Sequence, residues 1–196
     1  YGMQRMLTEQ RDEYFYLTLM NENYPQPAMP EGAAEGIIKG MYLLTDAGKP
    51  KKGELRVQLM GSGTILREVI AAADLLDKDF GVSADIWSCP SFTELRRDGF
   101  DVERHNALHP EAKEPRKSHV AQCLEGRNGP AIAATDYVRE YADQIRAFVP
   151  MRYTVLGTDG YGRSDTRANL RQFFEVDRYH VAHAAIVALA ADGKMG

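Results

Sequence analysis

Stretches with the pattern of a buried strand alternate with stretches of helical pattern along most of this chain of 196 residues. Short runs rich in β-branched and aromatic residues predict strands, and a turn and a helical segment follow each of them. Four strand–helix units in succession predict a mostly parallel sheet with helices on both faces, because parallel strands need a crossover connection. The strands are expected at residues 54–60, 84–89, 131–135 and 153–156.

Capping residues place the helices between these strands. Ser91 and Glu94 have the spacing of a capping box, and Gly81 suits the left-handed position that ends a helix. Asp136 is expected to begin a helix, and Ser164 or Asp165 to cap another that starts near residue 166. The expected helices cover residues 31–44, the segment from the Gly61-Ser-Gly63 turn to about 78, a segment from 91, 118–124, 136–148, 166–174 and 177–191, with a turn at 49–53.

Composition narrows the class of protein. Apolar residues make up 44% and charged residues 27% of the chain, as in soluble globular domains. The net charge of −4, with scattered Lys and Arg, gives no support for a nucleic-acid partner. No apolar run reaches the roughly 20 residues that a membrane helix needs, so no membrane partner is expected. Two cysteines without metal spacing, Cys89 and Cys123, fit a reducing compartment, and a cytoplasmic location is predicted.

The beginning of the chain has a different pattern. Residues 14–20 read as a buried strand without a local partner, and a polar, proline-rich segment follows at 21–30. This order is typical of the last strand of one domain followed by a stiff linker, so we expect the chain to begin inside a preceding domain. An edge strand of a single domain is the alternative.

Candidate catalytic and metal-binding groups are sparse. Gly61-Ser-Gly63 lies between a strand and a helix, where it is either a structural tight turn or, less favoured, a phosphate cradle. Two histidine pairs, His105 with His109 and His180 with His183, have helical spacing but no acidic or sulfur ligand at motif distance. Cys89 has no evident activating base and reads as a core thiol. No complete catalytic constellation is therefore predicted.

The glycine-rich loop that follows the strand at 153–156 is the strongest candidate for a working surface. Its sequence is Gly157-Thr-Asp-Gly-Tyr-Gly-Arg-Ser-Asp-Thr-Arg167. Loops at the carboxyl ends of strands are where open α/β sheets place ligand and partner contacts. Arg163 could hold an anion, with Asp159 or Asp165 positioning it, or these charges could restrain the loop internally or contact another subunit. The candidate interface or active-site-mouth residues are Asp159, Tyr161, Arg163, Ser164, Asp165 and Arg167.

Several strings resemble one enzyme family. They are Asn21-Glu-Asn-Tyr24, Pro27-Ala-Met-Pro-Glu-Gly32, Ser91-Phe-Thr-Glu-Leu95 and Gly157-Thr-Asp-Gly-Tyr-Gly-Arg-Ser-Asp165. In order and spacing they resemble the C-terminal part of the homodimeric bacterial pyruvate dehydrogenases, whose C-terminal domain is of the transketolase type. The resemblance covers almost the whole chain, and Tyr161 departs from the family's usual phenylalanine.

The resemblance implies an α/β three-layer sandwich with a small, mostly parallel, mixed sheet, of the transketolase C-terminal-domain type. It divides the chain into the tail of a pyrimidine-binding domain (1–24), a linker and short helix (25–53) and the C-terminal domain (54–196). The complete enzyme would use thiamine diphosphate and Mg²⁺ to decarboxylate pyruvate, a step at the end of glycolysis, and would acetylate lipoyl groups on an acyltransferase component.

None of the family's cofactor or catalytic residues maps onto this chain. The resemblance therefore implies no catalytic, cofactor-binding or metal-binding residue here, and no cofactor in this part of the protein. Its expected role lies in the architecture of a homodimer and in the substrate entrance. Two alternatives are a docking module for the acyltransferase core, and the equivalent domain of another thiamine-dependent enzyme, such as a transketolase or a different 2-oxoacid dehydrogenase.

Overall fold

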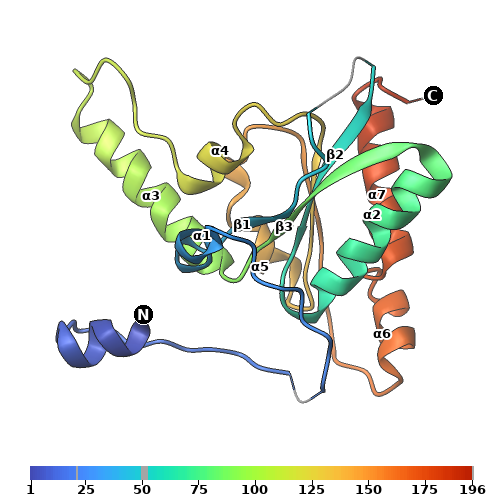
Figure 1. Cartoon of the computed structure of the whole chain (residues 1–196), viewed down its shortest axis with the longest axis horizontal. Helices are drawn as coiled ribbons and strands as arrows, with labels where there is room; N and C mark the ends of the chain where they lie inside the picture. Colours follow the sequence, from blue (N-terminus) through green and yellow to red (C-terminus); the bar gives the residue numbers. More distant parts are fainter. Residues whose placement is uncertain (21, 50–52, 196) are drawn as a thin grey trace.

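The computed structural model describes residues 1–20, 22–49 and 53–195, and its centre is a five-stranded mixed sheet (Figure 1). The strand order is β1-β3-β2-β4-β5. The parallel strands are β2 (Leu55–Gly61), β3 (Val82–Ser88), β4 (Ala131–Ala134) and β5 (Tyr153–Leu156), and β1 (Tyr42–Thr45) pairs antiparallel with β3. The four predicted strands and the mostly parallel sheet are confirmed.

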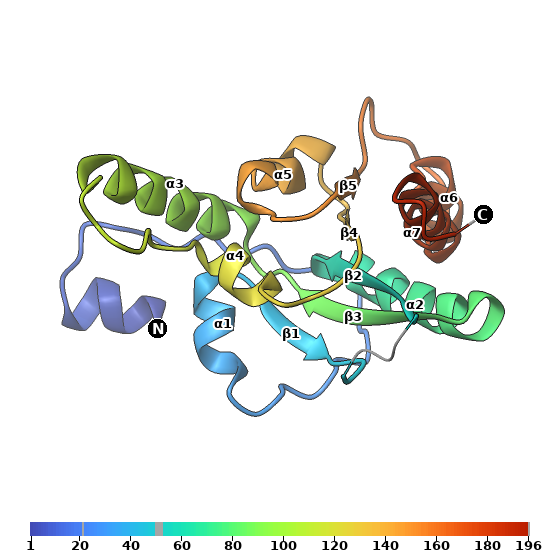
Figure 2. The ribbon, with the colours of Figure 1, turned by 90° about the horizontal axis from the view of Figure 1, so that it is seen from above.

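Helices cover both faces of this sheet (Figure 2). The α-helices are α1 (Ala33–Lys39), α2 (Leu66–Phe80), α3 (Phe92–Leu108), α4 (His119–Leu124), α5 (Arg139–Asp143), α6 (Arg167–Phe173) and α7 (Arg178–Ala191). Shorter turns are the π-helical η1 (Gln4–Thr8) and the 3₁₀ turns η2 (Gly63–Ile65) and η3 (Arg146–Phe148). None of the helices in the described ranges has the length and apolar character that crossing a membrane requires.

Two hydrophobic cores lie on opposite faces of the sheet. Alternate residues along β2 separate them, because successive side chains of a strand point to opposite faces. Val57 and Leu59 pack with α2 and α7, whereas Met60 packs with α3, α4 and α5. The molecule is therefore a three-layer α/β sandwich with a small mixed sheet, which confirms the predicted fold class.

Local capping signals were good predictors of helix ends. The side chain of Ser91 accepts a hydrogen bond from the backbone N–H of Glu94, and that of Ser118 from Ala121. Asp177 caps α7 in the same way. Gly81 ends α2 in the left-handed conformation, with φ of +62°. The predicted caps at Ser91 and Gly81 and the predicted helix starts at 118 and 177 are confirmed. The capping box is only half formed, because the carboxylate of Glu94 accepts from Arg97 and the N–H of Ser91 donates to the carbonyl of Gly40.

The predicted helix at 31–44 is wrong in its second half. Gly40 has φ of +96° and ends α1 at Lys39, and the chain continues as β1. Tyr42 pairs with Ser88 and Leu43 with Trp87 at the edge of the sheet. This pairing joins segments more than 40 residues apart, so the local pattern of the sequence did not predict it.

Two further helix boundaries differ from the prediction. Asp136 does not begin a helix: α5 starts at Arg139 and ends at Asp143, and the separate turn η3 follows. Thr166, not Ser164 or Asp165, caps α6, since its hydroxyl accepts from the backbone N–H of Asn169. The carboxylate of Asp165 instead accepts from the N–H of Thr166.

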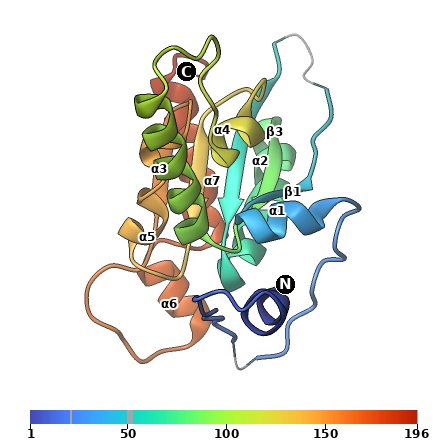
Figure 3. The same ribbon diagram turned by 90° about the vertical axis from the view of Figure 1, so that its left-hand side faces the viewer.

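The N-terminal arm, residues 1–30, does not contain the predicted strand. Residues 14–20 are extended and exposed and have no strand partner among the described residues. An extended segment becomes a strand only when another strand satisfies its backbone groups. Of the predicted turn at 49–53, residues 50–52 lie outside the described residues. Figure 3 places the arm and α6 at the same end of the molecule.

Candidate functional site

The glycine loop (residues 157–166) leaves the carboxyl end of β5 and remains on the surface. Its base is tied to the segment after β4, since the N–H of Thr158 donates to the carbonyl of Tyr137 over 2.8 Å. A Cβ on Gly157 would lie 2.7 Å from the backbone nitrogen of Arg139, so this close approach requires glycine. Tyr161, at the loop's apex, is 96% exposed.

The charges of this loop do not form the predicted Asp–Arg lattice around Arg163. Asp159 instead accepts hydrogen bonds from the backbone N–H and the guanidinium of Arg139. These two hydrogen bonds lower the pKa of Asp159. The guanidinium of Arg163 stacks on Phe173 of α6, 3.9 Å from the ring centroid. The prediction that Asp159 or Asp165 holds Arg163 is therefore wrong, whereas the proposed interface role of the loop stays a prediction.

The N-terminal arm also contacts this end of the molecule. Tyr137 donates its hydroxyl proton to Thr18 over 2.8 Å, and Arg167 donates to the carboxylate of Glu22 over 2.5 Å. The guanidinium of Arg67 on α2 lies 4.3 Å from the ring centroid of Tyr24. Three separate contacts thus hold Thr18, Glu22 and Tyr24 against the loop after β4, α6 and α2.

A cleft of about 370 Å³ opens beside the glycine loop. Its walls come from the segments that follow β2, β4 and β5, together with α6 and the arm residue Met20. Thr64, Asp136 and Thr158 supply polar groups, and three arginines of the loop and α6 supply positive charge: Arg163, Arg167 and Arg171.

Asp136 is the unusual side chain in this cleft. Its Oδ1 atom is buried and has no hydrogen-bond partner among the described residues. Burial raises the pKa of Asp136, and this effect outweighs the hydrogen bond from Thr64 and the charge of Arg171. An unpaired buried carboxylate oxygen is costly, which marks Asp136 as a group that a ligand or water could satisfy.

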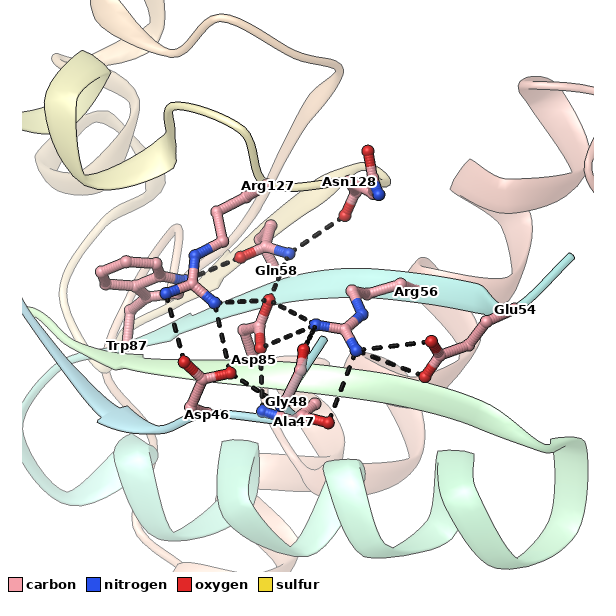
Figure 4. Close-up of polar contacts among 10 residues, drawn as sticks. All are labelled: Asp46, Ala47, Gly48, Glu54, Arg56, Gln58, Asp85, Trp87, Arg127 and Asn128. Carbon is pink, nitrogen blue, oxygen red and sulfur yellow. Dashed lines mark hydrogen bonds and ion pairs between the residues drawn. The ribbon is translucent and has the colours of Figure 1, made fainter. Parts of the chain in front are cut away.

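A second group of polar side chains lies toward the edge of the sheet where the parallel strands begin. We call it the amino-edge cluster, and its side chains are those of Asp46, Glu54, Arg56, Gln58, Asp85, Trp87 and Arg127 (Figure 4). Its centre is Asp85 of β3, which is fully buried. Asp85 accepts from the backbone N–H of Ala47 and from the amide of Gln58, each over 2.9 Å. Arg56 and Arg127 lie 3.3 Å and 3.5 Å from its carboxylate oxygens.

This cluster ties two loops to the strands. Arg56 Nη1 donates to the carbonyl of Gly48, and Gln58 donates to that of Asn128. Trp87 donates its indole N–H to Gln58. Sequence reasoning did not identify the cluster, although polar residues inside otherwise apolar strands were a usable signal. We assign it a structural role, because almost all of its donors and acceptors are paired within the molecule.

The remaining candidates have structural surroundings. Ser62 is buried and donates to Thr135, and a Cβ on Gly61 would lie 2.7 Å from the Cα of Leu66. Both observations support the tight-turn interpretation of Gly61-Ser-Gly63. The rings of His105 and His109 stack on each other.

The structure also shows what surrounds the remaining histidines and the two cysteines. His180 contacts the helix-capping Asp177, and the described residues contain no set of three or more His, Cys, Asp or Glu side chains suited to a metal ion. Burial raises the pKa of both thiols, Cys89 and Cys123. The Sγ atom of Cys123 lies 3.5 Å from His119 Nε2.

The fold and the cleft define a class: an α/β domain with a mixed sheet whose carboxyl edge carries the exposed loop and the polar cleft. The model of one family, the transketolase-like TK C-terminal domain, matches residues 40–177 of the chain. The chain belongs to this family.

Curated relatives are similar over the whole chain. It is 62% identical over 195 residues to the pyruvate dehydrogenase E1 component of Cupriavidus necator, a match that covers 100% of the chain and 22% of the relative. The E1 component of Pseudomonas aeruginosa is 61% identical, covering 98% of the chain and 22% of the relative. That of Escherichia coli K12 is 52% identical, covering 99% and 21%. The chain thus spans about a fifth of these relatives, in their C-terminal part.

Solved structures support the fold. A transketolase variant from Pichia stipitis matches with a TM-score of 0.57 and 18% identity, covering 89% of this chain and 21% of that one. The transketolase from Leishmania mexicana matches with a TM-score of 0.52 and 16% identity, covering 83% and 20%. At these identities the likeness concerns the fold alone.

Proposed function

We propose that the longer protein to which this chain corresponds is a pyruvate dehydrogenase. It would decarboxylate pyruvate oxidatively with thiamine diphosphate and Mg²⁺ and transfer the two-carbon unit to a lipoyl group of an acyltransferase component. The observation that carries this proposal is 62% identity over 195 residues with a relative of that name. No residue of this chain is assigned to the cofactor, because none of the family's cofactor residues maps onto it.

The test is turnover by the complete protein. Purified protein is incubated with thiamine diphosphate, Mg²⁺, pyruvate and an isolated lipoyl domain, and acetylation of the lipoyl domain is followed by mass spectrometry. We expect acetylation with pyruvate and little with 2-oxoglutarate. Turnover with 2-oxoglutarate, or ketol transfer between sugar phosphates without lipoyl acetylation, would instead support another thiamine-dependent enzyme.

The role that we propose for this domain is architectural. The glycine loop would contact the second subunit of a homodimer or border the active-site entrance. Support comes from its exposure and from its firm base: Tyr161 projects into solvent, while Arg139 holds Asp159 and Phe173 supports Arg163. An exposed aromatic side chain on a restrained loop is typical of a contact residue.

Tyr161→Ala in the complete protein tests this role. If the loop contacts the second subunit, we expect the dissociation constant of the dimer, measured by sedimentation, to rise about tenfold. If it borders the active-site entrance, we expect the rate of lipoyl acetylation to fall by a comparable factor. Tyr179→Ala is the control, since Tyr179 is an exposed tyrosine on α7. If mass and kinetics are unchanged in Tyr161→Ala, the loop has neither role. Retention of the acyltransferase core by this chain alone would favour a docking module instead.

A further inference from the structure

The position of the cleft beside the glycine loop is that of a ligand site in an open α/β sheet. The chain runs from β2 to β3 on one side of β2, and it then returns to add β4 on the other side of β2. The gap between β2 and β4 is therefore the point at which the strand order of the sheet switches direction. The crevice outside the carboxyl ends of the strands at such a switch point is where these sheets bind ligands. Thr64 follows β2 and Asp136 follows β4, and both line the cleft. Its volume of about 370 Å³ suits a small metabolite.

One arginine of this cleft, Arg163, has a guanidinium that can bind an anion. Within the described residues, no carboxylate lies at ion-pair distance from Arg163, whose contact is the face of Phe173. Stacking on a ring leaves the in-plane N–H groups of a guanidinium available to an anion. Arg167 is already paired with the carboxylate of Glu22, so it is not counted among the ligand-binding groups. Arg171 is paired with the buried Glu68 and is held in place by it.

Another residue that lines the cleft offers an acceptor. Asp136 contributes the buried Oδ1 atom that has no partner among the described residues. Because this atom is closed to solvent, a hydroxyl or ammonium group of a ligand would satisfy it after the carboxylate turns toward the cleft. Gly162 adds a second indication, because a Cβ there would meet nothing within 4 Å and its φ is not positive. The fold itself thus gives no reason for glycine at 162, whereas close approach of a ligand to the backbone would give one.

We propose that this cleft binds a small organic anion, with its phosphate or carboxylate group on Arg163 and a hydroxyl or ammonium group donating to Asp136. The proposal does not depend on the activity of the longer protein. It is tested by binding to this chain without any turnover, so its failure and the failure of the proposed function are separate results.

The first experiment is calorimetric titration of the chain with four probes. Glycerol 3-phosphate and glycerate carry both an anion and hydroxyl donors, inorganic phosphate carries the anion alone, and glycerol carries the donors alone. We expect saturable binding of glycerol 3-phosphate or glycerate at millimolar or lower concentration, at least fivefold tighter than phosphate, and none of glycerol. If glycerol 3-phosphate binds more tightly than glycerate, the ligand belongs to the phosphate class, and the reverse order assigns it to the carboxylate class. Absence of saturable binding by both would overturn the proposal.

Variants locate the site. Arg163→Ala should weaken binding of the tighter probe about tenfold, since a hydrogen bond between charged groups is worth a factor of this order. Arg96→Ala is a matched control, because Arg96 is also an exposed arginine stacked on a phenylalanine, 4.6 Å from the centroid of Phe100. Equal losses in both variants, or none in Arg163→Ala, would contradict the assignment.

Asp136→Ala should abolish the preference for the hydroxylated probe over phosphate and leave phosphate affinity unchanged. Amide NMR shifts of the unmodified chain provide a second measurement that does not depend on how this variant folds. Shifts induced by the probe should centre on Thr64, Asp136 and Gly162. Shifts centred on another part of the molecule would overturn the proposal.

Discussion

At the scale of single residues, the fully buried Asp85 holds the amino-edge cluster together. Arg56 is only 3% exposed, and Asp85→Ala would remove the buried carboxylate that pairs with its guanidinium. Removing one partner of a buried ion pair typically costs about 3–5 kcal/mol. We expect a loss of about 3 kcal/mol in the free energy of unfolding, because Glu54 still faces Arg56. Urea unfolding followed by circular dichroism measures it.

The matched control for Asp85 is Asp143, an exposed aspartate that pairs with Arg146 on the surface. Asp143→Ala should change the free energy of unfolding by less than about 1 kcal/mol, as is usual for exposed pairs. Similar losses in both variants would mean that the buried cluster contributes no more than an ordinary surface contact.

Gly129 permits a separate test of backbone packing. It has φ of +87°, and a Cβ there would lie 1.7 Å from the carbonyl oxygen of Arg56. Gly126 has a similar φ of +72° but open space around it. Gly126→Ala should therefore cost about 1–2 kcal/mol from backbone strain. Gly129→Ala should cost at least about 2 kcal/mol more, since the strand must also move. Thermal unfolding of the two variants compares them, and equal losses would contradict the close approach.

At the scale of elements, Glu68 joins α2 to both C-terminal helices. Its buried carboxylate accepts hydrogen bonds from Arg171 of α6 and from the backbone and guanidinium of Arg178 in α7. Burial acts to raise the pKa of Glu68, but the hydrogen bonds and charge of Arg178, with Arg171, outweigh it and leave the pKa lowered. A lowered folded-state pKa means that the ionised form stabilises the fold.

The sign of the pH dependence follows from this lowered pKa. The contribution of Glu68 is complete above the unfolded-state pKa of about 4.3 and is lost as the pH falls through the lower folded-state value. Glu68→Gln should reduce the free energy of unfolding by about 1.5–3 kcal/mol at pH 7, as for hydrogen bonds to charged groups. The difference from the unmodified chain should shrink as the pH approaches 3. Unfolding curves from pH 7 to pH 3 would contradict the assignment if the difference stayed constant.

The elements also separate what the sequence could predict from what it could not. Ser91, Ser118 and Gly81 act through groups within four residues, and these helix ends were predicted correctly. The strand β1 depends on pairing with β3, and the ends of α5 depend on how the segment after β4 meets the glycine loop. Such contacts between distant segments are decided by tertiary packing, which overrides local propensity.

The candidate site divides in the same way. Its place after β5 followed from the strand–helix order, since the carboxyl ends of parallel strands meet at one edge. The partners of its charges did not follow, because Arg139 and Phe173 reach the loop from other elements. Asp136 was interpreted as a helix start, and its unpaired oxygen became evident once Thr64 and the glycine loop surrounded it.

At the scale of the whole molecule, the N-terminal arm exposes several large apolar side chains. Four of these side chains are highly exposed: Tyr14, Tyr16, Leu17 and Leu19. Thr18, which lies among them, accepts a hydrogen bond from the hydroxyl of Tyr137. An extended apolar segment with unpaired backbone groups is a template for pairing with another chain. We therefore expect this chain to self-associate through residues 14–20 when its concentration is raised.

Replacing both leucines by serine tests this association. Burying one leucine contributes about 1.5–3 kcal/mol, so Leu17→Ser with Leu19→Ser should raise the dissociation constant at least tenfold in sedimentation experiments. Neither side chain packs into the two cores, so the melting temperature should be unchanged. Val187→Ser, at an exposed position on α7, is the control and should leave association as it is. An association that persists unaltered in the double variant would point to a different surface, with the glycine loop as the next to test.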